Sequence, residues 1–418
     1  MIVFVYSQIG RNAGHEIFFK KSVWKKLKNK LAVWVIKVGH RKTAKNLPMN
    51  ITLIEPFFTG SHAAWATGYA KYSGHTIDIL NLSGKYWKWR MHGGAVTLAE
   101  KFLTSDALPD LLLVSDMLDL TTFLALTRQK TAHLPAAIYF HENQICYPWS
   151  PKDRDIIHKR AQHYGFINYI SALAADKVVF NSCYHQEAFL GKLPRFLKQF
   201  PDLNELETVA TIRTKSCVLH LGLDLQKFDN PEFQQPRKEN TDTAPLILWN
   251  HRWEYDKNPE EFFQALFMLD EQGLNFRVAI LGESFRKSYP IFGTAREKLK
   301  EKIVHYGYAE DFAQYAQWLH RADIIPITSQ QEFFGASLVE ALYCGCYPLL
   351  PKRLTYPEIV PYETYPEIFY NNFQELVEKL AMALRTIDTI RQQNFRHCIK
   401  QYSWQHMAPR YDKFFGDL

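Results

Sequence analysis

From Met49 to the C-terminus, short apolar runs alternate with longer stretches in which apolar and polar residues recur at helical spacing. Short apolar runs bounded by polar residues or glycine are typical of strands that are buried on both faces of a sheet. Their regular alternation with amphipathic stretches predicts a parallel sheet covered by helices. The strands predicted in the first part of the chain are residues 51–54, 77–80, 111–114, 137–140, 177–180 and 217–219.

A second series of the same kind follows a polar segment. Residues 229–243 contain prolines and many charged or amide side chains without any period, which is the composition of a linker. A helix with its turn is expected before this segment, at residues 202–213. Beyond the linker, the pattern predicts strands at 246–249, 277–281, 303–306, 324–327 and 347–350, and helices at 259–272, 309–321 and 336–343.

This organisation predicts an α/β fold of two doubly wound, Rossmann-like domains that face each other across a cleft. The length of 418 residues agrees, because it is too long for one ordinary core. We place the first domain at residues 49–228, the linker at 229–245, the second domain at 246–395 and a closing helical segment at 396–418. Ligands of such folds bind at the carboxyl ends of the strands, so polar residues there are the candidates for chemistry.

Positive charge is concentrated in the first 48 residues, which carry eleven Lys or Arg and one acidic residue, Glu16. The rest of the chain holds 39 basic and 42 acidic residues. Two interpretations of this leader stay open. It is a basic arm that binds nucleic acid or anionic lipid, or it precedes the true start of translation at Met49. The slight acidity of the remainder argues against broad, nonspecific nucleic-acid binding.

The six cysteines favour a reducing compartment, since they lack the paired spacing of a disulfide framework or a zinc site. The pair in Cys344-Gly-Cys346 has poor spacing for zinc and is better read as two small buried thiols. No apolar run approaches the roughly 18 residues that span a bilayer. We therefore expect a cytoplasmic protein with no membrane span and no zinc site at its cysteines.

Polar residues follow two predicted strands of the first domain. Gly60 and Ser61 come just after the first strand and open a helix, where backbone amides bind anions, although a plain turn explains them about as well. His141, Glu142 and Asn143 directly follow the strand at 137–140. Three chemically capable side chains in a row at a strand end favour a functional role.

The second domain carries a pair of cations at the end of its first strand. Arg252 and Lys257 lie in one turn, and together they suit a diphosphate, with Arg as a two-pronged donor and Lys as a point charge. A surface loop of ion pairs with Glu254 and Asp256 is the alternative. Glu283 ends the next strand and is expected to face the same cleft.

Two carboxylates with seven residues between them follow a later strand. Glu332 is expected on a loop and Glu340 about one turn into the next helix, with Phe334, Gly335 and Ala336 leading into its first turn. Free amides at a helix N-terminus suit phosphates, while carboxylates accept hydrogen bonds from sugar and ribose hydroxyls.

The candidate residues of the second domain resemble those of a known family. The basic pair followed by Glu-x7-Glu resembles retaining glycosyltransferase family 4, whose two-domain architecture is called GT-B, and Tyr402-Ser-Trp404 with Tyr411 resembles the C-terminal helix that crosses back onto the first domain of that family. From about Met49 onward, the chain resembles the tRNA-queuosine α-mannosyltransferase family more specifically. The segments that carry this resemblance are IEPFFTGSH (54–62), KYWKWR (85–90), YFHENQ (139–144), VFNS (179–182), HRWEYDK (251–257) and EFFG (332–335).

The resemblance implies transfer of mannose from GDP-mannose, with retention, to the cyclopentenediol of queuosine in tRNA. Arg252 and Lys257 would neutralise the leaving diphosphate. Glu332 would hold hydroxyls of the donor sugar, Glu340 would hold the ribose, and His141 would lie at the reacting centre. No metal is implied, because cations and helix amides supply the charge that a divalent ion supplies elsewhere.

The segment 85–90 is the candidate for acceptor RNA. It interleaves cations with large rings, and this composition suits a phosphate backbone and stacked bases. If the segment is an extended loop, Trp87 and Trp89 lie on the same side, with Arg90 beside them. Glu142 and Asn143 are further acceptor candidates. Basic residues near 152–160 and 192–198 are better explained as solvated helix faces.

Two other classes of function stay open. One is a glycosyltransferase of the same fold that acts on a lipid, a polysaccharide or a small molecule. The other is a non-catalytic protein that binds tRNA or a nucleotide sugar, although the intact set of Arg252, Lys257, Glu332 and Glu340 argues against it.

Overall fold

The computed structural model describes residues 47–418 except 107, 151–152, 159–161, 234–243 and 283–288. The chain divides into two units after Leu47, and both sheets belong to the second unit, Pro48–Leu418. Two sequence predictions, the basic leader and the role of Glu283, therefore lie outside the described residues. Within the described part of the chain, no helix combines the length and the apolar character that crossing a membrane requires.

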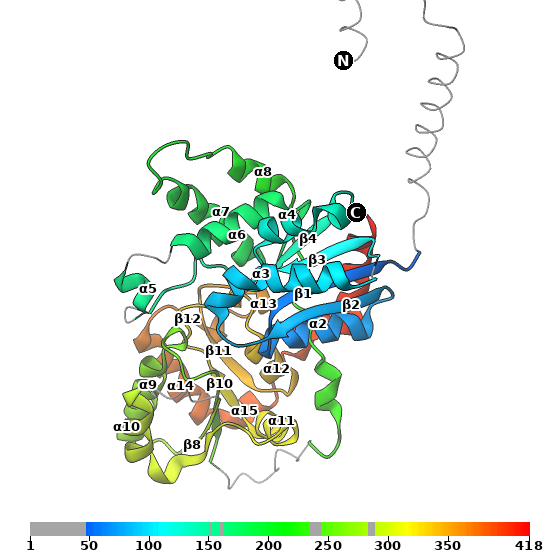
Figure 1. Cartoon of the computed structure of the whole chain (residues 1–418). Helices are drawn as coiled ribbons and strands as arrows, with labels where there is room; N and C mark the ends of the chain where they lie inside the picture. Colours follow the sequence, from blue (N-terminus) through cyan, green and yellow to red (C-terminus); the bar gives the residue numbers. More distant parts are fainter. Residues whose placement is uncertain (1–46, 107, 151–152, 159–161, 234–243, 283–288) are drawn as a thin grey trace, which may run out of the picture. The chain divides into compact units, whose positions relative to one another are not determined.

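The N-terminal half contains a six-stranded parallel sheet in the order β2-β1-β3-β4-β5-β6, of which Figure 1 labels β1 to β4. Its strands are β1 (Asn50–Phe58), β2 (Thr76–Ser83), β3 (Leu111–Ser115), β4 (Ala136–Phe140), β5 (Lys177–Phe180) and β6 (Ser216–Val218). Its helices are α2 (Gly60–Tyr72), α3 (Trp87–Thr104), α4 (Leu120–Thr131), α5 (Arg154–Ile157), α6 (Gln162–Ala174), α7 (Cys183–Leu197) and α8 (Thr208–Thr214).

The C-terminal half repeats this plan with the order β12-β11-β10-β7-β8-β9. Its strands are β7 (Leu246–Asn250), β8 (Arg277–Leu281), β9 (Ile303–Gly307), β10 (Ile324–Pro326), β11 (Tyr347–Pro351) and β12 (Phe369–Tyr370). Its longer helices are α9 (Pro259–Glu271), α10 (Pro290–Lys298), α11 (Phe312–Arg321), α12 (Ala336–Tyr343), α14 (Phe373–Arg385) and α17 (Trp404–Gly416). The predicted doubly wound α/β class is confirmed.

The central strands form because nearly every side chain on them is apolar and buried. All five residues of β3, of β4 and of β7 are buried, as expected for parallel strands covered on both faces by helices. Helix starts are fixed by side chains that accept hydrogen bonds from orphan amides: Asp119 caps α4, Ser182 caps α7 and Asp311 caps α11.

The C-terminal helix α17 returns to the first half and lies beside α2 (Figure 1). Gly68 of α2 makes this contact possible, since a Cβ atom there would lie 2.0 Å from Nε1 of Trp404. Asp412 accepts hydrogen bonds from the Tyr69 hydroxyl at 3.0 Å and from the Ser73 hydroxyl at 2.6 Å. The last helix is thus part of the core around the first sheet.

The extended loop predicted for residues 85–90 is wrong. Trp87 begins the helix α3, and Tyr86 before it takes the left-handed conformation with φ 56°. The reason is a helical period beyond the segment, in which Met91, Ala95 and Leu98 are all fully buried against the sheet. Residues two apart on a helix point in very different directions, so Trp87 and Trp89 do not share a side.

Candidate active site

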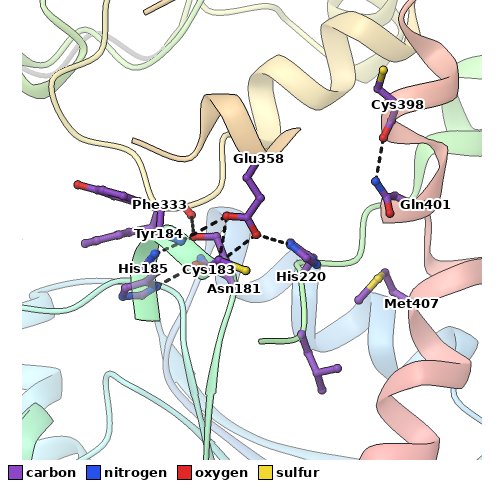
Figure 2. Close-up of polar contacts among 12 residues, drawn as sticks. Asn181, Cys183, Tyr184, His185, His220, Phe333, Glu358, Cys398, Gln401 and Met407 are labelled. Atoms are coloured by element: carbon purple, nitrogen blue, oxygen red, sulfur yellow. Dashed lines mark hydrogen bonds and ion pairs between the residues drawn. The ribbon is translucent and has the colours of Figure 1, made fainter. Parts of the chain in front are cut away.

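The loops that follow β5 and β10 join the two halves of the molecule. The Ser182 hydroxyl donates to the carbonyl oxygen of Phe333 at 2.5 Å. The His185 ring stacks on the Phe333 ring, and the two centroids are 3.9 Å apart (Figure 2). The Tyr255 hydroxyl also donates to the carbonyl oxygen of Pro148. These contacts bring the carboxyl edges of the two sheets together, and the candidate residues lie on those edges.

Glu358 of α13 (Tyr356–Ile359) strengthens this junction (Figure 2). Its carboxylate accepts the backbone N–H groups of Cys183 and Tyr184 at the start of α7, and His220 Nε2 lies 2.6 Å from it. Burial opposes the charged form, but His220 and the helix amides outweigh it and lower the pKa of Glu358. An anion at a helix N-terminus is favourable, so this contact is a latch between the halves.

His141 lies directly after β4 in a packed aromatic environment. Its ring is 4.2 Å from the His62 ring and 4.7 Å from the Trp65 ring, measured between centroids. Its backbone N–H donates to Asp116 Oδ1 at 2.8 Å, and Asn181 Nδ2 donates to its carbonyl oxygen at 2.9 Å. Nε2 is buried and finds no hydrogen-bond partner among the described residues. Burial, together with neighbouring His62, holds the pKa of His141 well below its usual range, so the imidazole is neutral.

His62 and Glu55 form a buried ion pair beside this ring. His62 Nδ1 donates to Glu55 Oε2 at 3.0 Å, while the Phe57 N–H donates to Glu55 Oε1 at 2.8 Å. Burial lowers the pKa of His62, but the adjacent carboxylate of Glu55 outweighs it, and the pKa rises to about 9. At the start of α2, a charged imidazolium therefore lies against a neutral imidazole, with the two rings tilted by 40°.

Asp116 closes the same cluster from the end of β3. Its Oδ2 is buried without a partner in the described part of the chain. Burial raises the pKa of Asp116 to about 8, with a further contribution from Glu142 and against the effect of His62. The raised pKa favours the neutral form of Asp116 at neutral pH.

Glu55, His62 and His141 offer ligand atoms within 4.8 Å of one another, and this is the group of described residues with the spacing of a metal site. The ion pair uses His62 Nδ1, and a protonated imidazole has no lone pair to give a metal. The donor set thus suits a charge pair better than a cation. Our expectation that no metal is needed stays a prediction.

The two cations of the second half differ sharply. The Arg252 side chain is exposed, and no hydrogen bond or ion pair to another described residue holds it. Lys257 is buried, and its Nζ lies 3.1 Å from Asp256 Oδ2, 3.1 Å from Glu332 Oε2 and 3.2 Å from the carbonyl oxygen of Gln331. Burial disfavours the charge of Lys257, but Glu332 and Asp256 outweigh it and raise its pKa. Arg252 is available to a ligand, whereas Lys257 already holds Glu332.

Glu332 is fixed at both carboxylate oxygens. Oε2 accepts from Lys257, and Oε1 accepts the N–H of Phe333 at 3.2 Å. Burial raises its pKa, but Lys257 outweighs burial, so the pKa of Glu332 is lowered and the carboxylate stays ionised. Glu340, on α12, accepts from the Tyr315 hydroxyl at 2.8 Å. Both carboxylates are therefore oriented before any ligand arrives.

Two helices present uncapped N-termini at these edges. Gly60 begins α2 with φ 51° and Gly335 precedes α12 with φ 88°, backbone conformations that favour glycine. Neither helix has a side-chain cap, so the first amides of both are free to bind an anion.

Comparison with known proteins decides the family. Residues 50–223 match the family described as tRNA-queuosine alpha-mannosyltransferase N-terminal, and residues 231–401 match glycosyl transferases group 1. The tRNA-queuosine alpha-mannosyltransferase of Drosophila melanogaster is 33% identical over 377 residues, which cover 88% of this chain and 96% of the fly protein. This chain belongs to the tRNA-queuosine alpha-mannosyltransferase family.

Solved structures show that this family member has the GT-B fold. Sucrose-phosphate synthase from Thermosynechococcus elongatus superposes with a TM-score of 0.63 at 14% identity, over 88% of this chain and 98% of that one. HepE of Anabaena, solved in complex with UDP and glucose, gives a TM-score of 0.60 at 14% identity, over 88% and 100% of the two chains. The predicted family, fold class and glycosyltransferase activity are confirmed.

The structure adds residues to the candidate site of this family member that the sequence did not predict. Glu55 and His62 are seven residues apart, and a charged residue inside an otherwise apolar strand was the available signal. His251, beside Arg252, is buried, and its Nε2 has no partner among the described residues. Burial lowers its pKa to about 3, so it is neutral. Asp116 gave no local signal beyond its place after a strand.

Two acceptor candidates lie close to His141. Glu142 is half-buried, and its Oε1 accepts from Gln144 Nε2 at 3.1 Å. Asn143 is fully buried, and its Oδ1 accepts the N–H of Cys146 at 2.8 Å, so part of its role is to shape the turn after β4. Its Nδ2 has no partner within the described residues.

Proposed function

We propose that this protein transfers mannose from GDP-mannose to queuosine in tRNA, with retention of configuration. The observation that supports this most strongly is that two pre-oriented carboxylates, Glu332 and Glu340, stand before and within α12, whose N-terminus has no side-chain cap. Arg252, which is exposed, follows β7 in the same half. The fly relative is named for the mannosylation of queuosine in tRNA, and this chain aligns with 96% of its length.

In this proposal the leaving GDP is bound by Arg252 and by the amides that begin α12, with Gly60 and Ser61 of α2 facing it from the other half. Charge that develops on the diphosphate as the glycosidic bond breaks meets donors that are already in place. Glu332 accepts hydrogen bonds from the mannose hydroxyls, and Glu340 accepts them from the ribose. Lys257 acts through Glu332, which it holds.

His141 lies across from these groups on the carboxyl edge of the first sheet. As a neutral imidazole it offers one nitrogen with a lone pair and one with a hydrogen, which suits a sugar hydroxyl. One bond forms between an acceptor hydroxyl oxygen and the anomeric carbon, and the bond to the diphosphate breaks. The hydroxyl proton leaves with the diphosphate. No step requires a metal.

Transfer to isolated tRNA tests the proposal. Purified protein is incubated with GDP-mannose and queuosine-containing tRNA, and the nucleosides are analysed by mass spectrometry for a gain of one hexose on queuosine. The same tRNA without queuosine, and UDP-glucose in place of GDP-mannose, are the controls. Hexose on a lipid or an oligosaccharide but never on queuosine would replace the acceptor assignment and keep the glycosyltransferase.

The six cysteines, which form no disulfide in the structure, support a reducing compartment such as the cytosol, where tRNA is also found. A fluorescent fusion of the full chain, imaged beside a cytosolic marker, tests that location.

A further inference from the structure

Two aromatic residues at the start of α3 are solvent-exposed although they flank a packed cluster. Tyr86 keeps 78% of its surface exposed and Trp89 keeps 64%. Between them, Trp87 turns inward, with its ring 5.8 Å from the Trp149 ring and 5.3 Å from the Tyr164 ring. The two outward rings are thus held on an anchored helix start.

Lys88 completes this anchor. Its Nζ lies 2.6 Å from Asp153 Oδ1 and within hydrogen-bonding distance of Asp155 Oδ2. Burial disfavours its charge, but the two aspartates outweigh burial and raise the pKa of Lys88. Because Trp87 and Lys88 are both engaged inside the protein, they are unavailable to a partner, and only their neighbours face outward in this segment of the described chain.

The Trp89 ring lies against the next turn of its own helix. A Cβ atom on Gly93, four residues later, would lie 2.6 Å from Cζ2 of Trp89. A side chain at this position would therefore displace the indole. Glycine inside a helix costs about 1 kcal/mol relative to alanine. Here it lets the indole lie close to the backbone, with one side supported and much of the ring exposed.

This pair adjoins the reaction centre. A Cβ atom on Gly84 would lie 2.2 Å from Cγ2 of Thr59, so the loop before Tyr86 packs on the turn before α2. Arg90 Nε donates to the Ser83 carbonyl oxygen at 3.0 Å and ties α3 to that loop. Three residues after Thr59, the His62 ring lies 4.2 Å from the His141 ring, measured between centroids. The loop that carries these rings therefore packs on the turn that leads to His62, the neighbour of His141.

We propose that Tyr86 and Trp89 form a stacking platform for unpaired bases of the RNA acceptor next to the nucleoside that receives the sugar. This inference rests on the proposed function. Exposed rings flanked in the sequence by the cations Lys85 and Arg90 suit single-stranded RNA, because bases stack on rings and phosphates contact cations. Because the helix supports only one side of the Trp89 indole, the other side is left for a base.

Binding and kinetics of matched variants test the platform. The variants are Tyr86→Ala with Trp89→Ala, Trp89→Phe, and Gly93→Ala, which keeps the indole but pushes it from its support. Tyr308→Ala, which removes a ring 72% exposed on the other half, is the control. The readouts are the KM for queuosine-containing tRNA, the Kd for a synthetic anticodon stem–loop, and the Kd for GDP.

Stacking contributes about 1–3 kcal/mol per ring, so we expect the double variant to raise the tRNA KM and the stem–loop Kd at least about tenfold. Trp89→Phe should restore part of the affinity, Gly93→Ala should lie between, and the Tyr308→Ala and GDP values should not move. Ring removal should leave the salt dependence unchanged, whereas Lys85→Ala should reduce its slope by about 0.7.

The outcomes separate the two ideas. Stem–loop binding by the double variant equal to that of the wild type overturns the platform, whatever the transfer assay shows. Loss of stem–loop binding supports it, even if no hexose reaches queuosine, and in that case the proposed function fails alone. Wild-type binding to anionic lipid vesicles without binding to the stem–loop also overturns it, in favour of a lipid surface.

Discussion

Arg252→Ala and Lys257→Ala each remove one cation from the same turn, but we expect the two variants to fail for different reasons. Arg252 is exposed and unpaired, so its loss should leave the free energy of unfolding within about 0.5 kcal/mol of the wild type. In the proposed complex it donates to the leaving diphosphate, and removing one such donor costs about 10²–10³ in kcat. The result should be a stable protein that transfers mannose poorly.

Lys257→Ala should instead destabilise the protein as well. The variant leaves Asp256, which is 1% exposed, and Glu332, which is 20% exposed, without the ammonium that lies 3.1 Å from each. Removing one partner of a buried ion pair costs about 3–5 kcal/mol, because the remaining charge has lost its compensation. Activity should fall too, since Glu332 loses the contact that orients it.

The assay pairs thermal unfolding with initial rates of transfer from GDP-mannose. Lys302→Ala is a matched control, because its Nζ also lies 3.1 Å from a carboxylate, that of Asp270, but at a more exposed position. Its loss should cost at most about 1 kcal/mol. Arg252→Lys should recover part of the rate, as it keeps the charge without the paired donors. Two results would refute the proposal that Lys257 stabilises the fold while Arg252 binds the diphosphate. One is a melting temperature of Lys257→Ala equal to that of the wild type, and the other is a transfer rate of Arg252→Ala within threefold of the wild type.

Four further predictions concern other contacts of the site. Glu340→Gln should raise the KM for GDP-mannose about tenfold with little change in kcat, because a ribose contact is shared by ground and transition states; equal losses in kcat would contradict this. Chelation by EDTA should leave transfer unchanged, and a loss that zinc restores would make Glu55, His62 and His141 a metal site. The pKa of His62 is raised to about 9, so its ion pair stabilises the fold fully below pH 6.5 and is lost as the pH rises through 9. His62→Gln should flatten that alkaline decline in melting temperature, and an unchanged decline would assign it to other groups. Glu358→Gln should weaken the latch between the halves and lower the melting temperature by a few degrees, with the exposed Glu363→Gln as a control.

The sequence predicted the strands well because burial on both faces leaves little choice of side chain. Every predicted strand is present, and the missed β12 has only two residues, too short for any period to show. The start of α3 was predicted wrongly as an extended loop. The composition of residues 85–90 suggested RNA binding, but the helical period of buried residues that includes Met91 begins in the same segment. Burial at that spacing, and not the composition of one short segment, decides where the helix begins.

The candidate site was predicted only as far as strand ends reveal it. His141 and Arg252 follow strands directly, so the rule that ligands bind at carboxyl ends found them. The partners of Lys257 could not be found in this way. Its contact with Glu332 spans 75 residues, and only the packing of β7 beside β10 brings the two side chains within 3.1 Å. The sequence showed a cation, whereas the fold decides whether that cation is free.

Two histidines of the site have buried nitrogens without a hydrogen-bond partner in the described part of the chain. His141 Nε2 in the first half and His251 Nε2 in the second are buried without a hydrogen-bond partner among the described residues. A buried polar atom left in this state costs about 1–3 kcal/mol, and native structures contain few of them. Glu332 and Glu340, by contrast, are fixed by Lys257 and by other donors before any substrate binds. A donor sugar that reaches both histidines would recover a cost already present in the folded protein, and the fixed carboxylates would lose little freedom in holding it. Each half carries one of these two histidine nitrogens, so one sugar can contact both only where the carboxyl edges of the two halves meet.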